Sequence, residues 1–118
     1  QPLKAIGQIA RRHQIVFHTD AVQAYGHIPI NVNECMIDML SMSAHKLHGP
    51  KGVGFLYIRN GLELPSYIDG GSQENGHRAG TSNVPGIVGL GKACEIAARN
   101  MQKNINSMTR LRNRLITK

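Results

Sequence analysis

Three hydrophobic patterns follow one another along the chain: a short helical repeat, a set of short apolar runs, and a long helical repeat. Over residues 3–13, apolar side chains recur at steps of three and four, which predicts an amphipathic helix with Gly7 as its weak point. Between Ile87 and Leu115 the same spacing continues and predicts one long amphipathic helix, kinked near residues 104–106. Its apolar stripe is typical of a helix that faces a core or a partner.

Two residues mark the start of the long helix. Asn83 can cap it, and Pro85 suits its first turn, where a backbone N–H would be unpaired in any case. Residues 59–83, before the helix, are rich in glycine and poor in apolar runs, so we expect an irregular segment there. Irregular segments of this length in a compact domain are more often functional than idle.

The short apolar runs predict three β-strands. Residues 15–18 are β-formers, and residues 36–43 are mostly apolar, as in a strand buried on both faces. Residues 53–58 form the third run, directly after a Gly-Pro turn.

The connections between these strands predict how they pair. Residues 21–26 make at best one helical turn, so the chain reads strand, turn, strand, which favours a parallel pair of residues 15–19 and 38–43. The turn before residues 53–58 is too short for a crossover, so that strand must run antiparallel to its predecessor. The pattern predicts an α/β fold with a mostly parallel sheet, one antiparallel strand and a long C-terminal helix.

Polar residues cluster where each of the two parallel strands ends. Asp20 and Gln23 follow the first strand, and Ser43, His45 and Lys46 follow the second. Ligands of open parallel sheets bind at this edge. A lysine held between buried strands is partly desolvated, which disfavours the ammonium form and makes the amine able to form an imine. We therefore expect the two clusters to form one pocket.

Other roles are open to these polar residues. Thr19 or Asp20 can cap the turn that follows the first strand, with Gln23 simply solvated. His45 and His48 are the only close histidine pair, and no carboxylate or thiol stands beside them, so we predict no metal site.

Composition narrows the class of protein. The 118 residues are 41% hydrophobic, which suits one domain, and no run approaches the roughly 20 apolar residues of a membrane span. The two cysteines are far apart, which fits the reducing cytoplasm better than a disulfide framework. Much of the net charge of +7 lies in the C-terminal helix without interleaved aromatic residues, so we expect a solvated face and no nucleic-acid partner.

The two polar clusters match what pyridoxal 5'-phosphate (PLP) requires of a protein. The cofactor needs a lysine for covalent attachment and a carboxylate facing its pyridine nitrogen. It also needs a neutral donor near its phenolate oxygen, and serine or histidine donors near its phosphate. Asp20, Gln23, Ser43, His45 and Lys46 provide that set in order along the chain.

Three motifs in a fixed order carry a resemblance to a known family. They are HTDAVQ at residues 18–23, DMLSMSAHKLHGPKG at residues 38–52, and GGSQENGHRAGT at residues 70–81. Together they closely resemble the class V aminotransferases, and within them the cysteine desulfurases of the NifS/IscS type. The resemblance implies the central part of the aspartate-aminotransferase-like large domain at residues 1–83, with the cofactor lysine loop at 43–52, and an interdomain helix at 84–118.

The resemblance also implies roles for individual residues. Lys46 would be the catalytic lysine that holds PLP, with Asp20 on the pyridinium nitrogen and Gln23 on the phenolate oxygen. Ser43 and His45 would bind the phosphate, together with Thr81, which in the family reaches the site of the neighbouring subunit. Family members are homodimers that convert L-cysteine to L-alanine and pass the sulfur, as a persulfide on a mobile cysteine, to an acceptor or scaffold protein for iron–sulfur assembly.

Several parts of the family's active site have no counterpart in these residues. They are the upstream Gly/Thr phosphate loop, the ring-stacking histidine, the substrate-binding arginine and the sulfur-accepting cysteine, which neither Cys35 nor Cys94 matches. The resemblance therefore predicts a fragment that is inactive alone. Two alternatives are a selenocysteine lyase or other class V lyase, and a non-catalytic binding or scaffold module.

Overall fold

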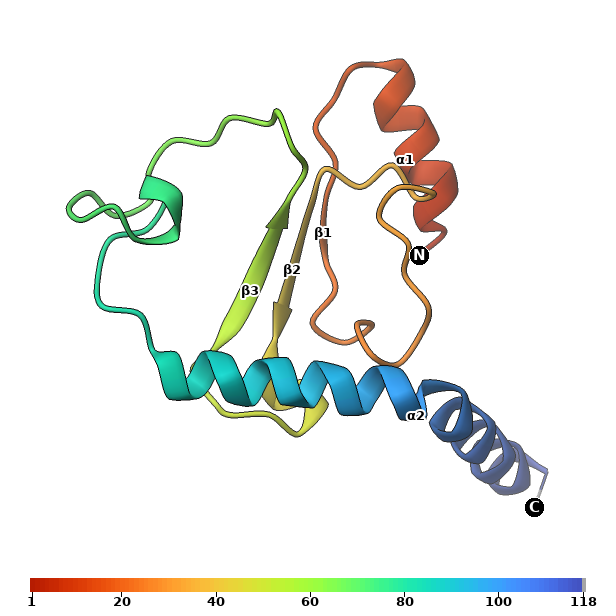
Figure 1. The fold of residues 1–118 in the computed structure, drawn as a ribbon. Helices are drawn as coiled ribbons and strands as arrows, with labels where there is room; N and C mark the ends of the chain where they lie inside the picture. The colour runs from red at the N-terminus through yellow and green to blue at the C-terminus, as the bar shows by residue number, and fades with distance from the viewer. Residues whose placement is uncertain (118) are drawn as a thin grey trace.

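In a computed structural model, which describes residues 1–117, two α-helices flank a small β-sheet (Figure 1). Residue 118, the last residue of the predicted helical segment 84–118, lies outside the described residues. The elements are α1 (Leu3–Arg12), β1 (His18–Asp20), β2 (Met39–Ser43), β3 (Gly54–Ile58) and α2 (Val84–Ile116), with short 3-10 helices η1 (Ala44–Leu47) and η2 (Gln73–Gly76).

The sheet has the pairing that the sequence predicts. Its order is β1-β2-β3, with β1 parallel to β2 and β3 antiparallel to β2. His18 lies opposite Met39 in the parallel pair, and Ser43 lies opposite Gly54 in the antiparallel pair. The predicted α/β architecture with a mixed sheet and a long C-terminal helix is therefore confirmed.

Strand β2 is buried on one face only, so the prediction of burial on both faces is wrong for this chain. Leu40 and Met42 are 2% and 5% exposed and belong to the core, whereas Ser41 and Ser43 are half-buried on the opposite face. The alternation of Leu and Met with Ser has the period of two that is typical of a half-buried strand. The second face is the more polar one, and it positions the candidate site.

The first two strands begin later than predicted. Ile15 and Val16 are 62% and 48% exposed and precede β1, and residues 36–38 precede β2. The reason is a local set of contacts at Phe17. Its N–H donates to the Asp38 carboxylate at 2.9 Å, and its carbonyl accepts from the N–H groups of Asp38 and Met39. The regular parallel pairing of β1 and β2 therefore starts only after these hydrogen bonds.

Asp38 ties the start of β2 to both neighbouring strands. Besides the Phe17 N–H, its carboxylate accepts from the Arg59 guanidinium directly after β3. Burial favours the neutral acid, but the Phe17 hydrogen bond and Arg59 outweigh it and lower the pKa of Asp38. The aspartate is thus a buried, charged and fully partnered structural residue.

Helix α2 begins as predicted and crosses the carboxyl end of β2 (Figure 1). The Asn83 side chain accepts from the Gly86 N–H at 3.2 Å, and proline stands in the first turn. Leu90 and Ala93 enter the core beside β2 and η1. The predicted stripe is therefore core in its first half, whereas Met108, Leu111 and Leu115 remain exposed: 49%, 56% and 79%.

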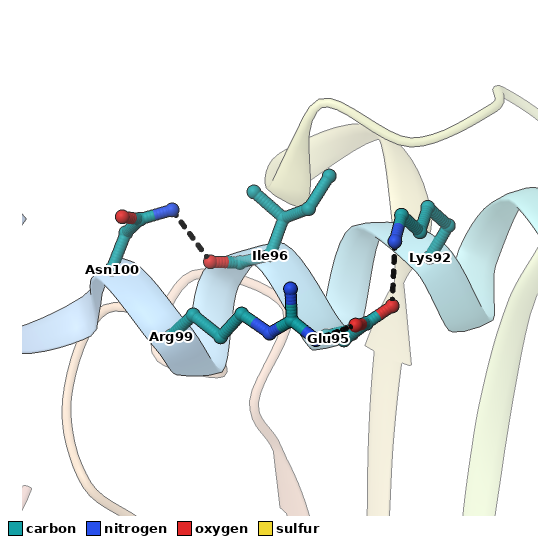
Figure 2. A network of polar contacts seen from close by, with 5 residues as sticks. All are labelled: Lys92, Glu95, Ile96, Arg99 and Asn100. Carbon is teal, nitrogen blue, oxygen red and sulfur yellow. Dashed lines mark hydrogen bonds and ion pairs between the residues drawn. The ribbon is translucent and has the colours of Figure 1, made fainter.

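The helix is continuous from residue 84 to residue 116, although Figure 1 shows it changing direction in its C-terminal half. Figure 2 shows the polar contacts near the middle. Glu95, the single acidic residue of α2, pairs with both Lys92 and Arg99. The Asn100 amide donates to the Ile96 carbonyl at 3.0 Å, a side-chain contact of the kind that competes with the helix ladder.

The chain exposes more surface than a compact monomer of its size. Its accessible area is 8842 Å², against about 6,300 Å² for a folded monomer of 12.9 kDa. Its radius of gyration is 16.9 Å, against about 13.5 Å for a compact chain of this length. The excess means that several faces lack the cover that a closed globular domain would give them.

Residues 59–83 are mostly irregular, as predicted. They contain η2 and one isolated bridge, between Ile68 and Arg78. Among residues 1–117, neither α1 nor α2 combines the length and the hydropathy that a membrane-spanning helix requires.

Candidate functional site

The uncovered face of the sheet carries a row of polar side chains. Alternation along β1 places His18 and Asp20 on one face, and alternation along β2 places Ser41 and Ser43 on one face. Asp20 lies opposite Ser41 in the parallel register, so both pairs share the face that points away from Leu40. Polar groups from two strands therefore gather toward their carboxyl ends.

Asp20 ends β1 and begins the turn that follows it. The next residue, Ala21, donates its N–H to the Ser41 carbonyl at 2.8 Å, which extends the parallel pairing past Asp20. One carboxylate oxygen of Asp20 accepts from the Val22 N–H at 2.9 Å, so Asp20 does cap the turn as the simpler interpretation requires. Its side chain is exposed, as is that of Gln23 in the same turn. Capping occupies one oxygen and leaves a carboxylate at the surface.

Lys46 lies in a 3-10 turn, where a polar loop was expected. Helix η1 follows β2 directly, with Ala44 and Leu47 buried in the core and Lys46 half-buried between them. His48 then adopts a left-handed conformation (φ 61°), and the N–H of Gly49 returns to the Ala44 carbonyl at 2.9 Å. The lysine is thus carried by a short, core-anchored turn at the end of the central strand.

Ser43 and His45 are in direct contact beside this lysine. The Ser43 hydroxyl and His45 Nδ1 are 2.8 Å apart. Both groups can donate hydrogen bonds to an anion. Of the five predicted residues near the strand ends, these are the two that the structure joins directly.

Thr81, in contrast, lies apart in the irregular segment before α2. It is exposed, and within residues 1–117 no hydrogen bond joins it to the strand-end cluster. The Gly80 N–H beside it is held by the Gln73 side-chain oxygen at 3.1 Å. The described contacts therefore do not bring Thr81 to the cluster around Lys46.

Two contacts of this region involve residues that sequence reasoning did not single out. His18 Nε2 is 3.2 Å from the Ser41 hydroxyl, and His27 Nε2 is 3.3 Å from the Lys46 carbonyl oxygen. The period of two along β1 and β2 could have placed His18 with Ser41. The His27 contact joins a turn to a 3-10 helix 19 residues away, and no local pattern indicates it.

The turn after β1 also packs against β3 and α2. Tyr25 and Phe55 meet edge to face, with ring centroids 5.3 Å apart. Burial raises the pKa of Tyr25, and the neighbouring Cys94 thiol adds to that effect. Burial also raises the pKa of Cys94, against the opposing effect of its hydrogen bond with Tyr25. Such a half-buried, neutral thiol is a packing group and not an activated nucleophile.

A separate hollow of the described residues lies away from the strand ends. It is a half-open groove of about 840 Å³ between β3, the irregular segment and the start of α2. Neither Asp20 nor Lys46 lines it. The candidate site therefore lies at the strand ends, where the lysine, the carboxylate and the hydroxyl–imidazole pair are found, and not in this groove.

The donor set at the strand ends fits PLP. It offers a half-buried lysine on a fixed turn, an exposed carboxylate at the end of the adjacent parallel strand, and a hydroxyl–imidazole pair next to the lysine. A carboxylate, an amine and two phosphate donors are the groups that this cofactor engages.

Comparisons with known proteins show which proteins this chain is similar to. A 116-residue stretch is 55% identical to the cysteine desulfurase IscS of Methanosarcina thermophila, covering 98% of this chain and 29% of that protein. A solved structure of a NifS-like protein superimposes with a TM-score of 0.93 at 44% identity, covering 99% of this chain and 33% of the other.

A further solved structure shows SspA in complex with cysteine. It is 52% identical, with a TM-score of 0.78, and the match covers 80% of this chain and 28% of that one. This chain spans about 29% of the length of the curated relatives it matches. The class-V aminotransferase family matches residues 1–118 from end to end, and the chain belongs to that family.

Proposed function

We propose that this chain is the cofactor-lysine region of a PLP-dependent cysteine desulfurase. The observation that carries the proposal is the placement of Lys46 and Asp20 at the ends of two adjacent parallel strands. A 55% identical relative is named a cysteine desulfurase, and a 52% identical protein has been solved in complex with cysteine. L-cysteine is therefore the substrate that we propose.

Each residue of the cluster has a separate task in this proposal. Lys46 holds the cofactor covalently, and Asp20 keeps the pyridine nitrogen protonated through its exposed carboxylate. Ser43 and His45 donate to the phosphate from their hydrogen-bonded pair. When bound, PLP supplies an electron-withdrawing ring that stabilises negative charge at the substrate Cα. The amine of Lys46 then serves to move the Cα proton.

Gln23 and Thr81 complete the proposed cofactor contacts. Gln23 is exposed in the turn three residues after Asp20, from which it can donate to the phenolate oxygen. Thr81 is exposed in the irregular segment before α2, and we propose that it contributes to the site of a second subunit in a homodimer. The surface area of the chain supports association of this kind. Its total accessible area exceeds the value expected of a compact monomer by about 2,500 Å².

We further propose a division of labour along the chain. Residues 1–83 form part of the cofactor-binding large domain, and the segment from residue 84 onward, with α2 at Val84–Ile116, leads to another domain. The parts of the site absent from these residues, including the sulfur-accepting cysteine, belong to a longer cytoplasmic protein that delivers sulfur to an acceptor or scaffold protein. The isolated chain then lacks desulfurase activity.

The test is a chimera in which residues 3–117 replace the matching segment of the Methanosarcina thermophila relative. With PLP and L-cysteine, we expect the chimera to form alanine and sulfane sulfur in equal amounts. Lys46→Ala in the chimera should abolish both products, whereas Lys51→Ala, five residues away and exposed, should retain them.

Other outcomes would redirect the assignment. A chimera that binds PLP but acts on selenocysteine and not on cysteine would contradict the desulfurase proposal and would favour a selenocysteine lyase. A folded chimera that takes up no PLP would favour a non-catalytic binding module.

A further inference from the structure

The backbone of Lys46 is held by a side chain from another part of the fold. Helix η1 ends at Leu47, and the N–H groups of His48 and Gly49 both bond to the Ala44 carbonyl. The last carbonyls of a helix have no N–H of the same helix to accept from, and they need a partner from outside. For the carbonyl of Lys46 that partner is His27, whose Nε2 lies 3.3 Å away.

The direction of this hydrogen bond is fixed by chemistry. A carbonyl oxygen can only accept, so His27 Nε2 must carry the proton that is shared. The contact is partly buried, which protects it from competition by water. A histidine in the other neutral tautomer could not make it.

His27 is well placed to hold the lysine turn because its own turn is fixed by hydrogen bonds and packing. The turn is closed by hydrogen bonds from Tyr25 N–H to the Ala21 carbonyl and from Ile28 N–H to the Ala24 carbonyl. Gly26 packs so closely on η1 that an added Cβ would stand 2.4 Å from a Leu47 methyl carbon. The turn is therefore seated on the helix that carries the lysine.

The same turn begins at Asp20. One hydrogen-bonded segment thus carries the candidate carboxylate at its start and the donor to the Lys46 backbone at its end. We propose that His27 is a positioning residue for Lys46, and that its Nε2–H holds the lysine turn in register with the carboxylate. This inference rests on the proposed function, since it concerns how the cofactor lysine is presented.

The test compares His27→Gln with His27→Met. The two side chains have nearly the same length, but only glutamine can donate to a carbonyl. Both variants are made in the whole 118-residue chain and in the chimera. The first measurement is reductive labelling by PLP and borohydride, expressed as the ratio of label on Lys46 to label on the exposed Lys51. We expect His27→Met to lower this ratio about 3- to 10-fold and His27→Gln to keep it within about twofold.

A second measurement requires no cofactor. Hydrogen–deuterium exchange of the peptide covering residues 44–49, followed by mass spectrometry, reports on the hydrogen bonds that close η1. His27→Met should speed exchange in that peptide, and His27→Gln should not. Exchange in α1 serves as the reference, because a general loss of stability would speed both segments equally.

The outcomes separate the inference from the proposed function. If the parent chain labels Lys51 as readily as Lys46, the cofactor proposal fails, and the exchange experiment still decides whether His27 holds the lysine turn. If the parent labels Lys46 selectively and His27→Met leaves both the ratio and the exchange unchanged, the inference is overturned. Equal loss in the Gln and Met variants would also overturn it, because donor chemistry would then be irrelevant.

Discussion

Asp20 and Ser41 lie directly opposite each other in the parallel pair, and the N–H donated by Ala21 to the Ser41 carbonyl continues the ladder beyond them. The backbone therefore holds the candidate carboxylate beside the strand that leads into the lysine turn. Substitution of the Lys46 side chain should leave this backbone arrangement intact, and Asp20→Ala should keep the ladder but remove the acceptor for the Val22 N–H. The effects of site variants and of core variants can therefore be measured separately.

Helix α1 lies very close to the backbone of Cys35 at Gly7. A Cβ added there would lie 1.9 Å from the Cys35 carbonyl oxygen, whereas one added at Gly91 in α2 would meet nothing within 4 Å. We expect Gly7→Ala to destabilise the fold by about 1–3 kcal/mol through overpacking. Gly91→Ala should stabilise it by about 0.5–1 kcal/mol through helix propensity. Urea denaturation of both variants checks the prediction, and shifts of the same sign would contradict it.

The Asp38 carboxylate should make the free energy of unfolding depend on pH. Its pKa is lowered in the folded state, so its contribution is fully present above the unfolded value of about 3.9 and is lost as the pH falls through the folded value. Asp38→Asn keeps the shape but removes the charge that faces Arg59. We expect the variant to be less stable by roughly 1–3 kcal/mol at pH 6, toward the low end because Arg59 is partly exposed.

The measurement for Asp38 is chemical denaturation of both proteins from pH 6 down to the acid limit of folding. The difference between parent and variant should shrink below about pH 4. A difference that stays constant over that range would mean that the carboxylate charge does not contribute.

The two cysteines should differ in reactivity. Burial raises the pKa of Cys94, so its thiolate fraction at pH 7 is small. We expect iodoacetamide to modify Cys35 several-fold faster than Cys94 at pH 7, and the rate at Cys94 to rise steeply toward pH 10. Peptide mass spectrometry of time points gives both rates in one sample. Faster labelling of Cys94 at neutral pH would contradict the packing role assigned to it.

Helices were predictable from the sequence because their signals are local. The predicted segment 3–13 and the observed Leu3–Arg12 differ by one residue, and the Asn83 cap lies where it was expected. The strands were less predictable, since their ends depend on a partner. Phe17 is a residue type that favours strands, yet its N–H donates to the carboxylate of Asp38, 21 residues away, and not to a neighbouring strand.

The candidate site was only partly readable from the sequence. Motif order and strand ends pointed to Asp20 and Lys46, because both follow apolar runs. The hydrogen bond between His27 and the Lys46 carbonyl could not be predicted, since it depends on how a turn packs onto a 3-10 helix of the same chain. The half-open face of β2 was missed because the mostly apolar run at residues 36–43 suggested full burial, while the two serines in β2 gave the alternation.

The central claim is that Lys46 is the residue that takes up PLP, and one measurement tests it most directly. The chain is incubated with PLP, reduced with borohydride and digested, and the modified lysines are mapped by mass spectrometry. The account predicts label concentrated on Lys46 and lost in Asp20→Ala. Label spread over the exposed lysines in proportion to their accessibility, and unchanged in Asp20→Ala, would contradict it.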